Sequence, residues 1–472
     1  MKFYEPPRVI EEQGKDYFIA PHPEPRKTPP NLIEILLGAR HSLLGNWTED
    51  LYRSGVDSFR ILNRDVVFVN SPDLVKYVMV TRAQNFERKS PQMRRALEKL
   101  LGDGLFISEG ETWKTRRPLV ADIVHKNRLP SFGGTFEQVT HQFAEGWAAL
   151  DGKEFELTSA MAELTAEIIA QTVFGRNLGA EAARRVIDGF TQYQSAVDSF
   201  NLGYFLGWDE GWPVRLNARK KSAVSMVHEV VEKVITDHIA GGGDEGSMVD
   251  LLVKRQQRSP ELGLDLTALR NEAATIFMAG HETTATTLTW AFYCLSKAPW
   301  VEKKLLAELD RVCPGRAPAF EDIDQLDYCR SIIQETLRLY PPVPLLPRQA
   351  READEVGGVK VEKGGLVMIS PWLLQRASDL WDKPTHFIPE RFENNAKVNP
   401  FAYIPFTVGP RICPGMNFGL SEAVVCFAIL AQRFRVTPRA GHVAEPVCRL
   451  TLRPHGGLRV RALPRQSEAL AA

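Results

Sequence analysis

The chain has 472 residues, of which 44% are hydrophobic and 25% charged, and its 58 basic side chains (Lys and Arg) balance 58 acidic ones (Asp and Glu). These values are typical of a globular protein that fills one large domain or two to three ordinary ones, and the balanced charge implies no nucleic-acid partner. None of the six cysteines forms a Cys-x-x-Cys pair, which argues against a disulfide framework or a zinc site and favours a reducing compartment.

The N-terminal segment from Met1 to Pro30 is charged and rich in proline. No run of 18 or more apolar residues occurs there or later, and no signal-peptide pattern is present. We therefore expect a soluble, cytoplasmic protein without a transmembrane anchor.

The predicted elements change in type along the chain. β-rich arms on either side of a central turn predict a hairpin over Phe59–Asn70, and Ser71 and Pro72 then begin a helix that runs through Val80. Helical patterns dominate from Ser90 to Leu339. Later β segments are expected at 359–361 and 366–369 and, as a hairpin, at 449–463. This order predicts a mainly α-helical fold with a small β-rich subdomain, and no linker divides it into independent domains.

Trp113 and Arg117 lie one turn apart on a predicted helix and can reach one target together. Taken alone, the pair is equally consistent with the start of an amphipathic helix that buries a tryptophan in the core.

The stretch from Ala279 to Thr284 lies inside a helix expected from about Asp265 to Lys297, roughly 50 Å long. A glycine followed by polar and β-branched residues is locally unfavourable in mid-helix, so a kink or local widening is expected. One interpretation is a packing glycine in a buried helix. The other is a groove at a catalytic centre, in which Glu282 and Thr283 are an acid and an alcohol that manage protons.

Glu335 and Arg338 have the i,i+3 spacing that places a carboxylate and a guanidinium on one helix face. Alone, this spacing is most simply a surface ion pair. Two prolines end the helix directly afterwards, and a Phe-Ile-Pro-Glu-Arg-Phe segment that contains Arg391 follows before the last cysteine-containing loop.

Cys413 lies in the stretch Phe-Thr-Val-Gly-Pro-Arg-Ile-Cys-Pro-Gly that ends at Gly415, just before an apolar helical pattern. A helix N-terminus favours a thiolate, Gly409 permits a turn and a close approach to a flat ligand, and Arg411 offers a rigid fork of donors to a carboxylate. A lone cysteine in such a place is commonly a buried structural residue. The neighbouring residue types favour a ligand to haem iron instead.

This stretch resembles the haem-binding loop of the cytochrome P450 family, Phe-x-x-Gly-x-Arg-x-Cys-x-Gly, at all five fixed positions. Thr407 departs from the family, which usually has Gly or Ser there. The other three motifs are similar to family motifs and come in the family's order. The resemblance covers about 50–463, so we expect a single haem domain over 1–472 with an N-terminal extension over 1–45.

The resemblance implies the cytochrome P450 fold, haem b as cofactor, Cys413 as the iron ligand and a role for each motif residue. Glu282 and Thr283 would relay protons to dioxygen. The remaining cofactor-binding residues would be Arg411, Trp113, Arg117, Arg348, Phe406 and Gly415. Glu335, Arg338 and Arg391 would hold the loop that presents the thiolate.

The implied reaction is a monooxygenation, in which one oxygen atom of O2 enters an organic substrate and the other leaves as water. A haem-thiolate peroxygenase or isomerase and a non-catalytic haem-binding sensor are the alternatives. Peroxygenases and isomerases typically lose the acid–alcohol pair, and a sensor would be expected to carry an output domain. The expected substrate is hydrophobic, such as a lipid-like, terpenoid, steroid, aromatic or bulky alicyclic compound. The candidate pocket residues are Thr275, Met278, Ala279, Val343, Leu345 and Leu346.

Electrons are expected from a ferredoxin and its reductase, which draws them from NAD(P)H, because the chain has no flavin or iron–sulfur segment. By resemblance the enzyme is of the soluble bacterial type, and we expect a monomer. A basic patch around the Trp113 helix would steer an acidic ferredoxin. Its members are Lys114, Arg116, Lys126 and Arg128.

Overall fold

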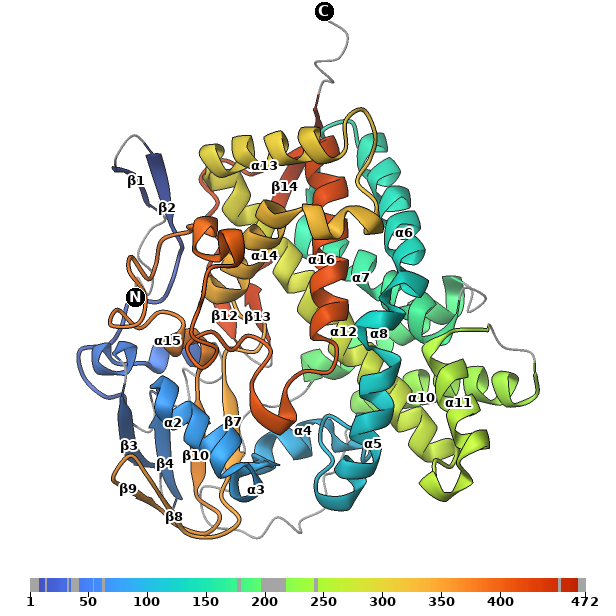
Figure 1. Ribbon diagram of the computed structural model, residues 1–472, viewed down its shortest axis with the longest axis vertical. Helices are drawn as coiled ribbons and strands as arrows, with labels where there is room; N and C mark the ends of the chain where they lie inside the picture. The colour runs from blue at the N-terminus through green and yellow to red at the C-terminus, as the bar shows by residue number, and fades with distance from the viewer. Residues whose placement is uncertain are drawn as a thin grey trace, which may run out of the picture.

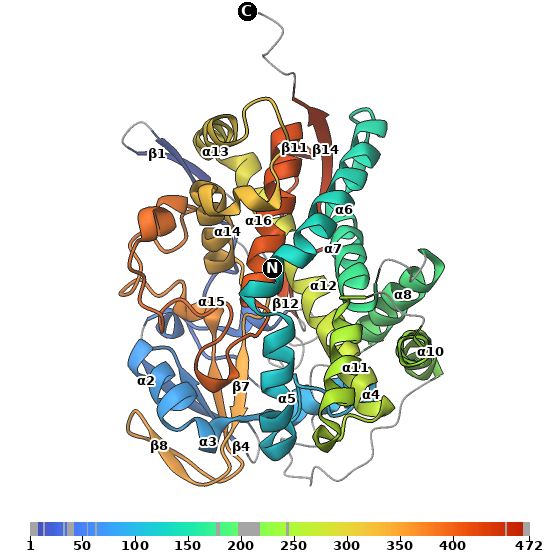
Figure 2. The same ribbon diagram turned by 45° about the vertical axis from the view of Figure 1, so that its right-hand side comes forward.

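A bundle of helices and a smaller, sheet-rich part lie side by side in the computed structural model (Figures 1 and 2). The structure describes residues 8–12, 15–31, 34, 42–53, 55–61, 64–175, 180–196, 218–241, 245–448 and 451–465. The expected fold class, mainly α with a small β-rich region, is confirmed.

The helices include eleven long ones. They are α4 (Pro91–Leu101), α5 (Gly110–Ile123), α6 (Leu129–Ala149), α7 (Leu157–Phe174), α8 (Ala180–Ala196), α10 (Ala218–Ile239), α11 (Met248–Arg258), α12 (Leu266–Lys297), α13 (Pro299–Val312), α14 (Asp327–Leu339) and α16 (Met416–Arg433) among the described residues. Short helical elements are η1 (Leu43–Asn46), η2 (Glu49–Tyr52), α2 (Pro72–Lys76), η3 (Tyr77–Thr81), α3 (Ala83–Phe86), η4 (Lys126–Arg128), η6 (Pro260–Leu262), η7 (Phe320–Gln325), α15 (Pro371–Leu374), η8 (Pro389–Asn395) and η9 (Gly409–Arg411).

Helix α12 is central to the bundle. Asp265 caps its N-terminus by accepting a hydrogen bond from Ala268 N at 2.7 Å. Gly280 lets α7 approach, because a Cβ built there would lie 2.7 Å from Ile169 Cδ1. The helix is continuous from Leu266 to Lys297, so the kink expected near Gly280 does not interrupt it. Close packing of α7 against the small residue holds this segment helical.

The largest sheet has the order β3-β4-β10-β7-β5, and β10 is parallel to β4 and antiparallel to β7. Its strands are β3 (Val56–Ile61), β4 (Arg64–Val69), β5 (Arg88–Lys89), β7 (Leu346–Gln349) and β10 (Leu366–Ile369). The predicted hairpin over 59–70 is confirmed as β3–β4, and Ser71 caps α2 by accepting from Leu74 N at 3.3 Å. Alternate apolar residues of β4 and β10 face two cores. One set packs into a second hydrophobic core (Val67, Val69, Val367 and Ile369), and the other packs into the main core of the bundle (Val66, Phe68 and Leu366).

The tail does not form the hairpin predicted over 449–463. Strand β13 (Leu452–Pro454) pairs with β12 (Pro446–Cys448), whereas β14 (Arg459–Pro464) pairs with β11 (Phe434–Pro438) and β6 (Glu154–Glu156). Gly456 and Gly457, both at positive φ, redirect the chain from one small sheet to the other. The sequence therefore predicts the turn and the two β segments beside it, but the predicted pairing of these segments with each other is wrong.

The described part of the N-terminal segment packs against the body. Strands β1 (Arg8–Glu12) and β2 (Lys15–Ile19) pair with each other, and Phe18 belongs to the main core. Tyr340 Oη donates to Pro21 O at 3.1 Å. The remaining short strands are β8 (Asp354–Val356) and β9 (Val359–Val361), which form a separate pair. No helix within the described residues is long and apolar enough to cross a membrane.

Candidate active site

Cys413 lies in the loop between η9 and the N-terminus of α16. Its backbone N–H donates to Phe406 O at 2.9 Å, which closes the loop. Gly409 has φ +75°, and a Cβ built there would lie 2.1 Å from Met79 O of η3. Only glycine fits at this contact between two backbones. Thr407 also has a positive φ, +57°, although it is β-branched.

Groups around the Cys413 sulfur have opposite effects on the pKa of its thiol. Burial raises the pKa of this thiol, whereas the N–H of Gly415 and the positive charges of Arg117 and Lys89 lower it. By accessible surface, however, the residue is only half-buried. Cys413 is thus less buried than the other five cysteines, which are all buried.

Cys426 differs from Cys413 although it lies only about three turns further along the same stretch. It is completely buried in the middle of α16, and its Sγ lies 3.1 Å from Thr140 Oγ1 of α6. Burial and the nearby Glu422 raise the pKa of the Cys426 thiol. This sulfur is held as a neutral packing group.

Basic side chains from four separate elements gather around the Cys413 loop. The Arg411 guanidinium stacks on the Trp113 ring at 4.2 Å, and its NH1 donates to Ser108 O at 2.8 Å. Burial, together with the neighbouring Arg411, lowers the pKa of Arg348 to about 10. Burial also lowers the pKa of Arg117, whereas the nearby Cys413 raises it. The structure therefore brings together the cofactor-binding candidates of α5, β7 and the cysteine loop.

Lys89 belongs to this group, and sequence reasoning missed it. It pairs with Arg348 across β5 and β7, donates to Phe106 O and lies over the Phe106 ring. Burial and the charges of Arg348 and Arg411 hold the pKa of Lys89 well below its usual range. A strand of two residues gives no periodic signal, so only the pairing with Arg348 identifies this lysine.

One face of α12 is open in the middle of a buried helix. The residues before Ala279 and after Thr283 are almost all buried, whereas Ala279 is exposed and Gly280 and Thr283 are half-buried. Thr283 Oγ1 donates to Ala279 O at 2.7 Å. Gly419 of α16 lies beside this helix, because a Cβ built there would be 3.8 Å from Thr284 Oγ1. Helix α16, which begins just after the Cys413 loop, therefore lies beside this segment of α12.

Glu282 faces away from Thr283, although the two residues are adjacent. Its carboxylate accepts hydrogen bonds from Thr451 Oγ1 and from Arg453 Nε, the latter at 2.5 Å. The Glu282 side chain is 6% exposed and that of Arg453 is 42% exposed, so this ion pair links the interior to solvent. Neither Thr451 nor Arg453 was a predicted site residue, and nothing local in the sequence couples the tail to α12.

Similarity to known proteins shows the family of this chain. The family model "Cytochrome P450" matches residues 27–458. The chain is 30% identical over 416 residues to cyclooctatin synthase of Streptomyces melanosporofaciens, which covers 86% of this chain and 88% of that protein. The chain belongs to the cytochrome P450 family.

Other similar proteins agree with this assignment. Carotene epsilon-monooxygenase of Arabidopsis thaliana is 29% identical over 445 residues, 86% of this chain and 78% of that protein. The crystal structure of the cytochrome P450DA heme domain superposes with a TM-score of 0.76 at 23% identity, over 87% of this chain and 90% of that one. This cytochrome P450 is a monooxygenase that uses haem b bound through a cysteine thiolate.

The residues present fit haem b. Four cationic side chains, Lys89, Arg117, Arg348 and Arg411, stand around one thiol and two nearby carboxylates, Glu109 and Glu87, whose Oε2 lies 3.7 Å from Arg411 NH2. Burial disfavours such an excess of positive charge. Arg411 Nε has no hydrogen-bond partner among the described residues. Two propionate carboxylates would supply the missing negative charge and acceptors.

The six candidate pocket residues differ in their surroundings. Thr275 and Met278 are buried on α12, and Thr275 Oγ1 lies against the loop before α5, where a Cβ on Gly104 would come within 2.1 Å of it. Leu345 packs against the main core. Val343 and Leu346 pack into the second core, beside the sheet. Among the six, Ala279 is the exposed one.

Glu335 and Arg338 form a fully buried pair rather than a surface one, with both side chains at 0% exposure. Arg338 Nε and NH2 each donate to a carboxylate oxygen of Glu335 at 2.7 Å. Ile388 N donates to Glu335 Oε1 at 2.9 Å, and Arg391 Nε lies 3.5 Å from the same oxygen. The pair therefore ties α14 to the segment that carries Arg391.

Gln375 extends this network toward the cysteine loop. Its side-chain amide donates to Leu337 O at 3.0 Å and to Arg338 O at 2.9 Å, and its Oε1 accepts from Ile404 N at 2.9 Å. Ile404 comes two residues before Phe406, whose carbonyl closes the loop. Sequence reasoning missed Gln375, because no motif residue marks it.

Arg116 is not part of a basic surface, contrary to the sequence-based expectation. Its NH1 and NH2 each donate to the Asp103 carboxylate at 2.8 Å, and NH1 also lies 3.2 Å from Glu272 Oε1 of α12. Burial raises the pKa of Glu272 to about 7. Arg116 instead fixes the loop before α5 on α12, because Leu105 N donates to Glu272 Oε2 at 3.1 Å.

Proposed function

We propose that Cys413 is the haem ligand and that the enzyme inserts one oxygen atom from O2 into a hydrophobic organic substrate, by hydroxylation or epoxidation. One observation carries the assignment of the ligand. Cys413 is the half-buried cysteine among six, whereas the other five are buried, and it alone has the positive charges of Arg117 and Lys89 beside it. A thiolate needs such neighbours to remain deprotonated.

The residues around Cys413 would hold the cofactor. Arg117, Arg348, Arg411 and Lys89 supply donors for two propionates, and Trp113 fixes Arg411 by stacking. Phe406 and Gly415 shape the loop at either side of the cysteine. Bound haem supplies the activation of O2 and the transfer of one oxygen atom.

Two residues of α12 would manage protons in separate ways. The Thr283 hydroxyl borders the open face of α12 and donates to Ala279 O, so it could give up this hydrogen bond and present its proton to the reaction site. Glu282 is held by Thr451 and by the solvent-exposed Arg453, so it can accept protons from the surface side. Retention of both residues favours a monooxygenase over the peroxygenase and isomerase alternatives.

Names of similar proteins guide the substrate class. Besides the two relatives already described, the chain is 29% identical over 351 residues to cyclooctat-9-en-7-ol 5-monooxygenase of Streptomyces melanosporofaciens. An unsaturated cyclic alcohol and a carotene thus stand in the names of relatives. We infer that the substrate is bulky, mainly apolar and of terpenoid type. We also infer that the enzyme is a cytoplasmic monomer and that it receives electrons from a ferredoxin and its NAD(P)H-dependent reductase.

Carbon monoxide spectroscopy of the reduced protein tests the ligand. Wild type should show the red-shifted Soret band of thiolate ligation, and Cys413→Ser should lose it. Cys426→Ser is the matched control and should keep the band. A thiolate band in Cys413→Ser, or its loss in Cys426→Ser with intact fold by circular dichroism, would refute the assignment.

A further inference from the structure

The helical segment behind the cysteine loop contains a π-helix. Helix η3 continues α2 without a break, and Arg82 N donates to Tyr77 O, five residues earlier, at 2.7 Å. Such a turn is rare within an α-helical segment and is frequently found at functional sites. Met79 O of this turn lies against Gly409, at the contact that only glycine allows. The shape of the π-turn therefore limits where the cysteine loop can lie.

Asp354 of β8 binds both ends of this π-turn. Its carboxylate accepts a hydrogen bond from Tyr77 Oη at 3.0 Å and another from Arg82 Nε at 2.9 Å. These are the same two residues that the backbone hydrogen bond of the π-turn joins. Burial raises the pKa of Asp354, but the hydrogen bonds from Asn85 and Arg82 outweigh this effect and hold the pKa below its ordinary value. A charged carboxylate thus bridges the turn from outside the helix.

Asn85 of α3 fixes the position of this carboxylate. Its Nδ2 donates to Asp354 Oδ2 at 2.8 Å, and its Oδ1 accepts from the backbone N–H groups of Arg351 and Glu352 at 3.0 and 2.9 Å. The hairpin of β8 and β9 lies next to α2 and α3 in both views of the molecule (Figures 1 and 2), and its apolar side chains share the second core with those of η3. Asp354 is therefore held in place from the hairpin and from the helical segment.

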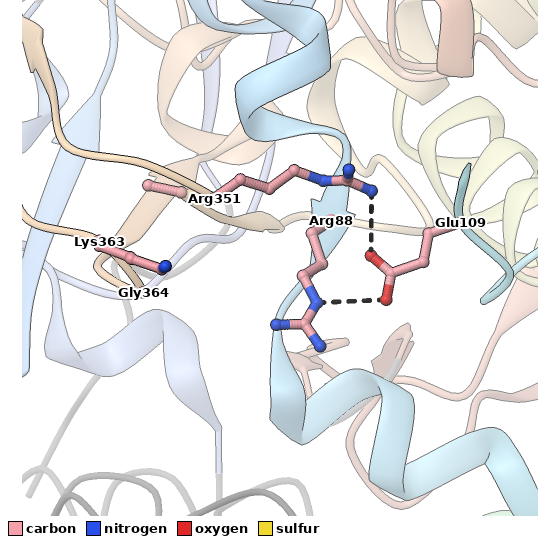
Figure 3. A pocket seen from close by; sticks show the side chains of 6 residues that line it. Arg88, Glu109, Arg351, Lys363 and Gly364 are labelled. Atoms are coloured by element: carbon pink, nitrogen blue, oxygen red, sulfur yellow. Dashed lines mark hydrogen bonds and ion pairs between the residues drawn. The ribbon is translucent and has the colours of Figure 1, made fainter.

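A second set of contacts joins the same hairpin to the cofactor-binding residues. Arg351 NH2 lies 2.6 Å from Glu87 Oε1, and Glu87 Oε2 lies 3.7 Å from NH2 of Arg411 in the cysteine loop. Figure 3 shows the Arg351 side chain directed at Glu109, whose carboxylate is 3.7 Å away beside a cleft of about 360 Å³. Residues 351–354 thus reach the cysteine loop by two routes, one through η3 and one through Glu87.

We propose that Asp354 is a positioning residue for the Cys413 loop. By bridging the ends of the π-turn, it keeps Met79 O against Gly409. Without the bridge the turn can relax to the α-helix that continues from α2, and Met79 O then moves away from the loop. A looser loop admits water to the sulfur, and hydrogen bonds from water reduce the electron donation of a thiolate to iron. The inference rests on the proposed role of Cys413 as the iron ligand.

Two substitutions in the haem-loaded protein weaken the bridge. Tyr77→Phe keeps the ring and removes only the hydrogen bond of its hydroxyl group. Asp354→Asn keeps the size of the side chain, but it removes the charge and places an amide N–H against the donors of Arg82 or Tyr77. The matched control is Glu355→Gln, which removes an exposed negative charge from the same hairpin, where the Glu355 side chain makes no hydrogen bond among the described residues.

The readouts are the carbon monoxide band of the reduced protein and the reduction potential of its iron. Under conditions where circular dichroism shows an intact fold, Asp354→Asn should lose the red-shifted thiolate band about tenfold faster than wild type, and Tyr77→Phe about threefold faster. The reduction potential should shift upward in both variants, because the thiolate donates less to iron. Glu355→Gln should match wild type in both readouts.

The outcomes separate positioning from a purely structural role and from the ligand assignment. A lower urea midpoint with an unchanged potential and band lifetime in Tyr77→Phe would overturn the positioning role, as would equal changes in Glu355→Gln. Tyr77→Phe decides the test if Asp354→Asn does not retain haem. Absence of the thiolate band in wild type would refute Cys413 as the ligand, and the positioning role with it.

Discussion

Glu335 and Glu422 are both glutamates with completely buried side chains, but their surroundings differ. Glu335 accepts two hydrogen bonds from Arg338 and one from a backbone N–H. Glu422, in α16, has a single hydrogen bond among the described residues, accepted from Thr284 Oγ1 at 3.2 Å, and its Oε1 has no partner there. The first carboxylate is compensated by a cation, and the second is not.

The two buried acids therefore have different roles. Paired with Arg338, Glu335 joins α14 to the segment before the cysteine loop. Burial without a cation raises the pKa of Glu422 to about 8, so its carboxyl is protonated at neutral pH, and Thr284 Oγ1 donates to its Oε2. A charge-bearing residue type in the core thus does not by itself indicate a charge.

The largest effect is expected at Glu335. Glu335→Gln keeps the size of the side chain but leaves the Arg338 guanidinium buried without its counter-charge. Loss of one partner of a buried pair costs about 3–5 kcal/mol of stability, and haem retention should fall with it. Urea unfolding of the haem-loaded protein measures this cost.

The control for Glu335→Gln is a surface ion pair. Glu145→Gln removes the partner of Arg433, where the side chains are 71% and 31% exposed, and should cost much less stability than Glu335→Gln. Equal costs in the two variants would contradict the distinction between buried and exposed pairs.

Glu422 should make stability depend on pH in the opposite direction from a paired acid. Its pKa of about 8 in the folded protein lies above the value of 4.5 expected when unfolded, so the folded state holds the proton more tightly. This stabilisation is complete below pH 4.5 and is lost as pH rises toward 8, by up to about 1.4 kcal/mol per pH unit.

Replacing the titrating group tests this expectation. Glu422→Gln should unfold with a flatter dependence on pH between about 5.5 and 7.5 and should be more stable than wild type at pH 8. Glu145→Gln is again the control and should follow the wild-type curve. Parallel curves for wild type and Glu422→Gln would show that the buried carboxyl does not change its protonation on unfolding.

Glu282 lies between these two cases, because it is buried while its partner Arg453 is half exposed. We expect Glu282→Gln to lower coupled product formation about 100-fold and Arg453→Gln about tenfold, with more peroxide released per NADPH. Arg453→Lys should restore most of the coupling. Arg453→Gln should also lower stability, because it leaves the buried Glu282 carboxylate without its cation, whereas Arg453→Lys should lower it less.

Product and peroxide yields, together with the solvent isotope effect on turnover, distinguish a proton role from a structural one. The assay uses a hydrophobic compound chosen by its substrate-induced spectral shift. An Arg453→Gln enzyme with wild-type coupling and isotope effect would contradict a role for the tail strand in proton supply.

Local spacing decided which of these residues could be predicted from the sequence. Glu335 and Arg338 are one helical turn apart, so a motif of four residues contains the pair. Arg453 meets Glu282 only because β13 lies beside α12, and Glu422 sits in an apolar helix pattern where an outward-facing carboxylate would be assumed. The same limit explains the tail, where both arms of the turn were recognised as β segments but their sheet partners were not.

Surface assignments failed for a related reason. Arg116 follows Lys114 in a charged segment, and only the fold places Asp103 and Glu272 around it. Helix periodicity can indicate which face of a helix is buried, but not whether an acidic side chain lies on the element that packs against that face. Lys89 is the reverse case, a charge brought into the site by a strand of two residues.

The smallest effect is expected at Thr407, in the loop that the Glu335 network supports. Its φ of +57° is unfavourable for a β-branched residue, and it stands where the family usually has Gly or Ser. Thr407→Gly should raise stability by about 1 kcal/mol, because relief of this conformation outweighs the greater flexibility of the unfolded chain and the lost contact between Val408 N and Thr407 Oγ1 at 2.7 Å. The matched control is Thr437→Gly in the extended strand β11, which should lower stability by a similar amount. Thermal unfolding of the two haem-loaded variants measures whether each substitution raises or lowers stability. A Thr407→Gly protein less stable than wild type would mean that the hydroxyl contact, not the backbone conformation, dominates at this position.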